Sequence, residues 1–111
     1  MKFSIPELDD LFNELKIIHN KLKIVHGNFN REVPEQLMAL KYIKGDEKIL
    51  EIGGNIGRNS LIISYLLNNS KNLVVLETNN DYCKKLEENK KINNFSFNLL
   101  NYALSKKKLY Q

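Results

Sequence analysis

A glycine-rich stretch follows an acid at the end of an apolar run, in LEIGGNIGRNS from Leu50 to Ser60. Glycine lets the backbone approach a ligand closely, and the stretch supplies Gly53, Gly54 and Gly57. The amides that begin a following helix can receive a carboxylate or a phosphate. Glu77 stands about 20 residues further on, where an acid can bond both hydroxyls of a ribose. These residue types and spacings predict a site for a nucleoside-containing cofactor.

The spacing of the glycines distinguishes between classes of cofactor. A phosphate-binding loop requires GxxxxGK[ST], and no lysine follows Gly57. A dinucleotide site requires GxGxxG, which Gly53 to Gly57 do not supply. Glu51 stands before the glycines, where an acid would repel a pyrophosphate but could receive the ammonium of an amino-acid moiety. The pattern therefore favours S-adenosylmethionine over NAD.

Two helices are predicted before the glycine stretch. Apolar residues recur at helical spacing from Pro6 to about Leu22, which predicts one amphipathic helix. Pro34 can open a second helix, which Gly45 would end. The apolar face of this second helix is predicted to consist of Leu37, Met38, Leu40 and Tyr42.

The hydrophobic period changes from Lys48 onwards. The predicted strands are KILEI (48–52), NLVVLE (72–77) and FSFNLL (95–100), and the segments 59–67 and 81–91 between them are predicted helices. Strands that alternate with helices form parallel βαβ units. The predicted fold class is therefore α/β, with a Rossmann-like parallel sheet of about three strands preceded by two helices. The glycine stretch then lies at the carboxyl edge of the sheet, where ligands bind.

Length and composition fit a single small core. The chain has 111 residues, of which 42% are hydrophobic, and this is enough apolar material to bury a core. We expect residues 1–45 to form a helical segment that packs on the sheet. Residues 46–111 are expected to form an S-adenosylmethionine-binding, Rossmann-like domain.

Charge and hydropathy argue against several classes of function. The net charge of +4 comes mostly from lysines, and no aromatic platform alternates with them, which argues against a nucleic-acid interface. No apolar run approaches the roughly 18 residues of a membrane span, so we expect a soluble, cytoplasmic protein without a membrane partner. Cys83 is the only cysteine, which excludes an internal disulfide. Neither histidine has a companion at metal-ligand spacing, so no metal site is expected.

Two stretches resemble the class I S-adenosylmethionine-dependent methyltransferases, and the FkbM family in particular. They are LEIGGNIGRNSLI (50–62) and NYALSKKKL (101–109). The first motif of the family is commonly an acid, an apolar residue, glycine, a small residue, asparagine or histidine, an apolar residue and glycine. Residues Glu51 to Gly57 match this motif at every position.

The resemblance implies roles for the matching residues. The methionine end of S-adenosylmethionine would be lined by Glu51, Gly53, Asn55 and Gly57. Asn59 and Ser60 would add contacts from the start of the helix, and Glu77 would hold the ribose.

The resemblance also places a segment beside the adenine. This segment corresponds to Asn101, Tyr102 and Ala103, and Leu104 and Ser105 continue the pattern. The loop HGNFNREVPEQ (26–36) is expected to fold over the cofactor, as upstream segments do in this superfamily. Its weaker candidate contacts are Phe29, Arg31 and Glu32.

The reaction that the resemblance implies is methyl transfer to oxygen of a small-molecule or glycan acceptor. The resemblance covers roughly residues 48–111, and a complete fold of this family has more strands than the three counted here. We therefore expect an N-terminal portion of such an enzyme, incomplete for catalysis alone, whose first strand is an apolar edge able to pair. No catalytic residue is assigned, although Glu32 and Glu35 are conceivable general bases.

Three other interpretations stay open. The glycine stretch can be a tight turn, with Glu77 facing solvent at the end of a strand. The chain can be a catalytically inactive module that binds the cofactor, or a protein partner through its exposed sheet edge. It can also be a basic nucleic-acid binder, which a steep dependence of affinity on salt would support.

Overall fold

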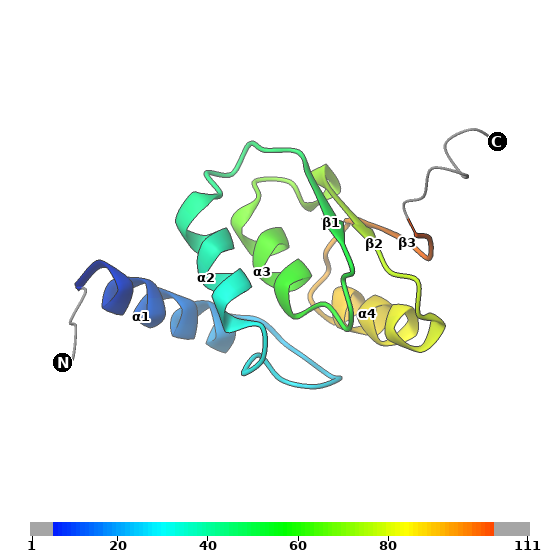
Figure 1. The fold of residues 1–111 in the computed structure, drawn as a ribbon, viewed down its shortest axis with the longest axis horizontal. Helices are drawn as coiled ribbons and strands as arrows, with labels where there is room; N and C mark the ends of the chain where they lie inside the picture. Colours follow the sequence, from blue (N-terminus) through cyan, green and yellow to red (C-terminus); the bar gives the residue numbers. More distant parts are fainter. Residues whose placement is uncertain (1–5, 104–111) are drawn as a thin grey trace.

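A computed structural model describes residues 6–103 of the chain. The elements in chain order are α1 (Pro6–Lys21), α2 (Val33–Tyr42), β1 (Ile49–Ile52), α3 (Arg58–Leu66), the 3₁₀ turn η1 (Ser70–Asn72), β2 (Leu73–Leu76), α4 (Asn80–Ile92) and β3 (Asn98–Leu100) (Figure 1). The prediction of an α/β fold with a three-stranded parallel sheet preceded by two helices is confirmed. The third strand is shorter than predicted, because Phe95 to Phe97 lie outside it.

The sheet is open and parallel, with the strand order β1-β2-β3. Ile52 pairs with Leu76, and Leu76 pairs with Leu100, so the three strands end level with one another. Both crossover helices cover the same face, because Ile63 of α3 and Leu86 of α4 share one buried cluster with Val75 of β2. The loops that follow the three strands therefore meet at one edge of the sheet.

The opposite face of the sheet is not covered by any described element. Leu50 and Ile52 of β1 are 52% and 63% exposed, and Leu100 of β3 is 38% exposed. Parallel sheets usually carry helices on both faces. This sheet thus presents an apolar face, and β1 presents a free edge, to solvent.

The two N-terminal helices pack on α3 and form an outer layer (Figure 1). Leu15 and Ile18 of α1 are buried in one cluster with Leu61 and Ile62 of α3. Since Ile63, the next residue of α3, belongs to the sheet cluster, this helix is buried on both sides. One continuous core therefore joins the segment before residue 45 to the sheet.

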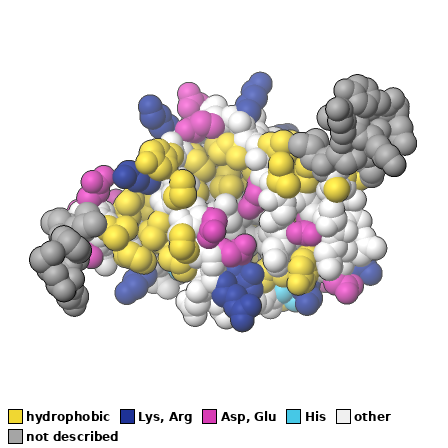
Figure 2. All heavy atoms as spheres, viewed as in Figure 1, with side chains coloured by type: hydrophobic (Ala, Val, Ile, Leu, Met, Phe, Trp, Pro, Cys, Tyr) yellow, Lys and Arg dark blue, Asp and Glu magenta, His cyan; other side chains and the backbone are white. Residues whose placement is uncertain are grey.

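The predicted apolar face of α2 is wrong in part. Met38 and Tyr42 are each 62% exposed, whereas the polar Gln36 is fully buried. Figure 2 shows hydrophobic side chains gathered on the outer surface of α1 and α2. Gln36 is buried because its side-chain amide bonds the backbone of the loop between α1 and α2.

No helix within residues 6–103 is both long enough and apolar enough to cross a membrane.

Candidate functional site

The glycine loop, residues 53–57, joins β1 to α3 at the carboxyl edge of the sheet. The amides of Gly53 and Gly54 both donate to the carbonyl of Leu76, at 2.8 and 3.1 Å. The amide of Gly57 donates to the carbonyl of Gly54 at 2.9 Å. The loop therefore turns sharply while it stays bonded to the end of β2.

Each glycine of this loop has a different surrounding. A Cβ atom on Gly54 would lie 2.3 Å from Cγ1 of Val75 and 2.8 Å from Cδ1 of Leu86, so this glycine is required by packing against β2 and α4. Gly57, at φ +101°, also faces Leu86. Gly53, at φ +79°, has no neighbouring atom within 4 Å of its Cβ position. Among the three, Gly53 is the one that leaves room for a ligand.

Glu51 points from β1 towards the first turn of α3. Its carboxylate accepts hydrogen bonds from the Ser60 hydroxyl and, at 3.4 Å, from Nδ2 of Asn59. Burial raises the pKa of the Glu51 carboxyl to about 7, against the effect of these two hydrogen bonds, and the charge of Glu32 raises this pKa further. The group therefore titrates near neutral pH, and a cation beside it would favour the ionised form.

Asn59 leaves one hydrogen-bond acceptor unused next to Glu51. Its Oδ1 atom is buried and has no partner within the described part of the chain. A buried amide oxygen without a partner is unusual and destabilising. Together with the Glu51 carboxylate, it forms a group of acceptors that suits an ammonium donor.

Glu77 immediately follows β2 and connects two loops. Its Oε1 accepts from the Asn55 amide at 2.7 Å, and its Oε2 accepts from the Asn79 amide at 2.8 Å. The interpretation that Glu77 faces solvent at the end of a strand is wrong, because this residue is only 7% exposed. The carboxylate therefore holds the glycine loop against the start of α4.

The segment after β3 lies beside Glu77. Nδ2 of Asn101 donates to the Glu77 carbonyl at 2.7 Å, which brings the third loop next to the second. Asn101, Tyr102 and Ala103 are exposed. Leu104 and Ser105, which continue the motif in the sequence, lie outside the described residues.

The loop between α1 and α2 carries three further candidates with different surroundings. Phe29 is buried and stacks on His19, with their ring centroids 4.6 Å apart. Arg31 is exposed, and Glu32 lies 3.5 Å from the guanidinium of Arg58. Phe29 is thus part of the core, whereas Arg31 and Glu32 lie close to the glycine loop.

Two buried amides hold this loop in place, and sequence reasoning missed both. Gln36 donates to the carbonyls of Phe29 and Arg31, at 3.1 and 2.9 Å, and its Oε1 lies 2.6 Å from Nε2 of His19. Asn89 of α4 is fully buried and accepts the amides of Val25 and His26. For Gln36 the available signal was a polar residue beside the apolar residues of α2, because a buried amide must find partners. Asn89 lies in a mostly polar helix, whose sequence gives no such signal.

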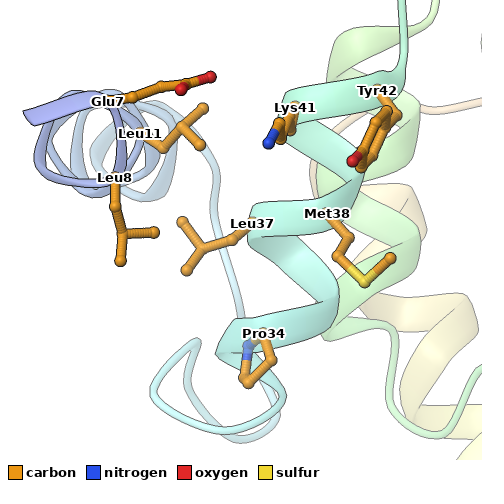
Figure 3. Close-up of a pocket in the computed structure, with 8 residues that line it drawn as sticks. All are labelled: Glu7, Leu8, Leu11, Pro34, Leu37, Met38, Lys41 and Tyr42. Carbon is orange, nitrogen blue, oxygen red and sulfur yellow. The ribbon is translucent and has the colours of Figure 1, made fainter. Parts of the chain in front are cut away.

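A groove of about 520 Å³ lies away from this site, between α1 and α2. Leu11 of α1 and Leu37 of α2 project towards one another across it, and Glu7 and Lys41 lie at one end (Figure 3). None of the glycine-loop residues lines this groove. Its lining is mostly apolar, and its titratable side chains are Glu7, Lys41 and Tyr42.

Cys83 has the surroundings of an inert thiol. Its Sγ donates to the Glu77 carbonyl at 3.2 Å, and burial raises the pKa of the thiol. A raised pKa lowers the fraction of reactive thiolate. Residues 6–103 contain no group of three or more His, Cys, Asp or Glu side chains able to hold a metal ion.

Comparison of the chain with family models, with curated proteins and with solved structures found no match.

Proposed function

We propose that the chain binds S-adenosylmethionine at the carboxyl edge of its sheet and serves methyl transfer to oxygen of a small-molecule or glycan acceptor. The observation that carries the proposal is the convergence of Glu51, Gly53 and Glu77 at the ends of two paired parallel strands. The carboxyl edge of an open α/β sheet is where such folds bind ligands. The FkbM-like motif supplies the choice of cofactor.

The acceptor atoms at this edge fit the polar ends of S-adenosylmethionine. Each carboxylate oxygen of Glu77 accepts one amide and retains a second lone pair for a ribose hydroxyl. The Glu51 carboxylate and Asn59 Oδ1 suit the ammonium of the methionine moiety. The cofactor would supply a methyl group on a sulfonium, and the residues of the chain would hold and orient it.

The proposal is tested by calorimetric titration of the chain with S-adenosylhomocysteine, with NAD as the competing cofactor. We expect S-adenosylhomocysteine to bind and NAD not to bind. Glu51→Gln should weaken binding roughly tenfold, which is the loss of about one charge-assisted hydrogen bond. Glu14→Gln, which changes an exposed acid on α1, is the matched control and should bind as the parent does.

A folded sample that binds neither compound would refute the proposal, and so would equal affinity for NAD. Folding of each variant is checked by circular dichroism before titration. A positive result then calls for a methyl-transfer assay with radiolabelled cofactor and hydroxyl-bearing acceptors.

The exposed sheet face favours a second candidate function. Leu50 and Ile52 present apolar surface beside the free edge of β1. A catalytically inactive module that binds the cofactor, or a protein partner through this edge, would use that surface. Turnover of methyl groups distinguishes the enzyme from the inactive module.

A further inference from the structure

A polar cavity of about 410 Å³ lies beside the glycine loop, between the α1–α2 loop and α4. Its walls include four basic side chains, no acidic one, and the polar side chains of Asn55 and Tyr82. The basic residues are His26, Arg31, Arg58 and Lys85. Figure 2 shows Lys and Arg side chains gathered over the α1–α2 loop, at the lower edge of the view.

The positive charge of this cavity is only partly neutralised. His26 pairs with Glu88 at 2.5 Å, and Arg58 lies 3.5 Å from Glu32. Arg31 and Lys85 have no ion-pair partner within residues 6–103. Two cations thus face a polar cavity without a counter-charge, an arrangement that attracts an anion.

A buried side chain, Asn89, links the walls of the cavity by hydrogen bonds. Oδ1 of Asn89 accepts the amides of Val25 and His26, at 2.7 and 3.1 Å. Its Nδ2 donates to the carbonyls of His26 and Ile56, at 3.2 and 2.8 Å. Asn89 therefore ties the α1–α2 loop and the glycine loop to α4, and the three walls keep a fixed spacing.

Arg58 provides a second link between the walls. Its Nε donates to the carbonyl of Asn28 at 2.8 Å, and its side chain is only 13% exposed. The guanidinium is therefore held at the cavity instead of extending freely into water. Because Nε bonds Asn28 and Nη1 lies near Glu32, Nη2 is the nitrogen left to bond an oxygen of a phosphate or carboxylate.

We propose that this cavity binds a phosphate group, and that the phosphate belongs to the methyl acceptor. Asn55 lines the cavity and also bonds Glu77, so the anion would be held directly beside the candidate cofactor site. The binding of phosphate rests on the cavity alone. Its assignment to the acceptor rests on the proposed function.

The experiment is a titration of the ¹⁵N-labelled chain with inorganic phosphate at constant ionic strength, followed by amide chemical shifts. We expect saturable shifts in the glycine loop and in residues 25–31. Arg31→Gln and Lys85→Gln should each weaken phosphate binding roughly tenfold, because each removes one charge-assisted contact. Lys84→Gln is the matched control, since Lys84 neighbours Lys85 on α4 and does not line the cavity.

Absence of a saturable shift in the folded parent would overturn the proposal. Equal weakening by Lys84→Gln and Lys85→Gln would also overturn it, because it would indicate a diffuse attraction to surface charge. The titration is repeated with saturating S-adenosylhomocysteine. Unchanged phosphate affinity supports the assignment to the acceptor, whereas loss of phosphate binding would assign the cations to the cofactor carboxylate and overturn the acceptor.

The repeat also separates the two proposals. If phosphate binds and S-adenosylhomocysteine does not, the proposed function fails, the anion site stands and its assignment to the acceptor falls. If S-adenosylhomocysteine binds and phosphate does not, the cofactor site stands and the anion site falls.

Discussion

At the scale of single residues, Glu51 links the fold to the candidate chemistry. Its pKa of about 7 lies above the value of 4.5 for an unperturbed glutamate. Between these two values the folded state binds more protons than the unfolded state does. The folded state therefore favours the protonated Glu51 carboxyl. This contribution to stability is complete below pH 4.5 and is lost as the pH rises towards 7.

We predict that Glu51→Gln removes this pH dependence of the free energy of unfolding. At pH 8 the free energy of unfolding of the variant should exceed that of the parent by on the order of 3 kcal/mol, which is the equivalent of the pKa difference. Urea unfolding at pH 5 and pH 8 measures the effect. Glu14→Gln should follow the parent at both values, and parallel curves for Glu51→Gln and the parent would contradict the prediction.

The ionisation of Glu51 also predicts how ligand affinity depends on pH. An ammonium group prefers the ionised carboxylate, so the affinity for S-adenosylhomocysteine should rise as the pH increases through about 7. Calorimetric titration at pH 6 and pH 8 measures this change. An affinity of the parent that does not change with pH would show that Glu51 does not contact the ligand.

We predict that substitution of two adjacent glycines lowers the stability of the chain by different amounts. In Gly54→Ala, the new Cβ would meet Val75 at 2.3 Å, and the overpacking should destabilise the chain by about 3 kcal/mol. In Gly53→Ala, the new Cβ meets open space, and the left-handed backbone should cost only about 1 kcal/mol. Denaturant unfolding compares the two, and equal losses would show that packing at Gly54 relaxes.

At the scale of elements, two side chains on α4 and α2 hold the α1–α2 loop in place. Asn89 holds the α1–α2 loop to the glycine loop, and Gln36 closes the other end of the same loop. Hydrogen bonds therefore fix the loop that carries Arg31 to the folded core. Both residues act by positioning the loop.

We predict that Asn89→Ala destabilises the chain by roughly 2 to 4 kcal/mol, because the buried Ile56 carbonyl and three partly buried backbone groups lose their partner. Hydrogen exchange should accelerate at the amides of Val25 and His26, which lose their acceptor. Asn13→Ala on the exposed face of α1 is the control and should change stability by less than about 0.5 kcal/mol. Unchanged exchange at Val25 would refute the link.

At the scale of the whole molecule, the layers are unequally covered. Two layers of helices lie on one face of the sheet, and the other face shows Leu50, Ile52 and Leu100. A parallel sheet with one open apolar face and a free edge strand tends to associate. The expected pairing through the sheet edge would bury this surface.

We predict that the chain self-associates and that Ile52→Lys reduces this association. Ile52 is 63% exposed, so the substitution should alter the stability of the monomer by less than about 1 kcal/mol. Sedimentation velocity over a range of concentrations measures the association. Ile17→Lys changes an isoleucine of α1 that is 54% exposed, and it should leave the association unchanged.

The amino-acid sequence alone determined the order of helices and strands and the place of the glycine loop. Hydrophobic periodicity is local, and the alternation of strands and helices requires a parallel sheet. The prediction was least accurate at the ends of elements and on the face of α2, where Met38 is exposed and Gln36 is buried. Polar burial depends on partners that periodicity does not contain.

Only the tertiary structure decided what the conspicuous residues contact. Gly54 packs on Val75, Glu77 bonds the amide of Asn55, and Asn89 bonds a loop 63 and 64 positions away. The basic cavity likewise joins residues of three separate segments. These contacts form when the core closes, and no local pattern encodes them, because the partners of a buried polar group are chosen by the packing of distant elements.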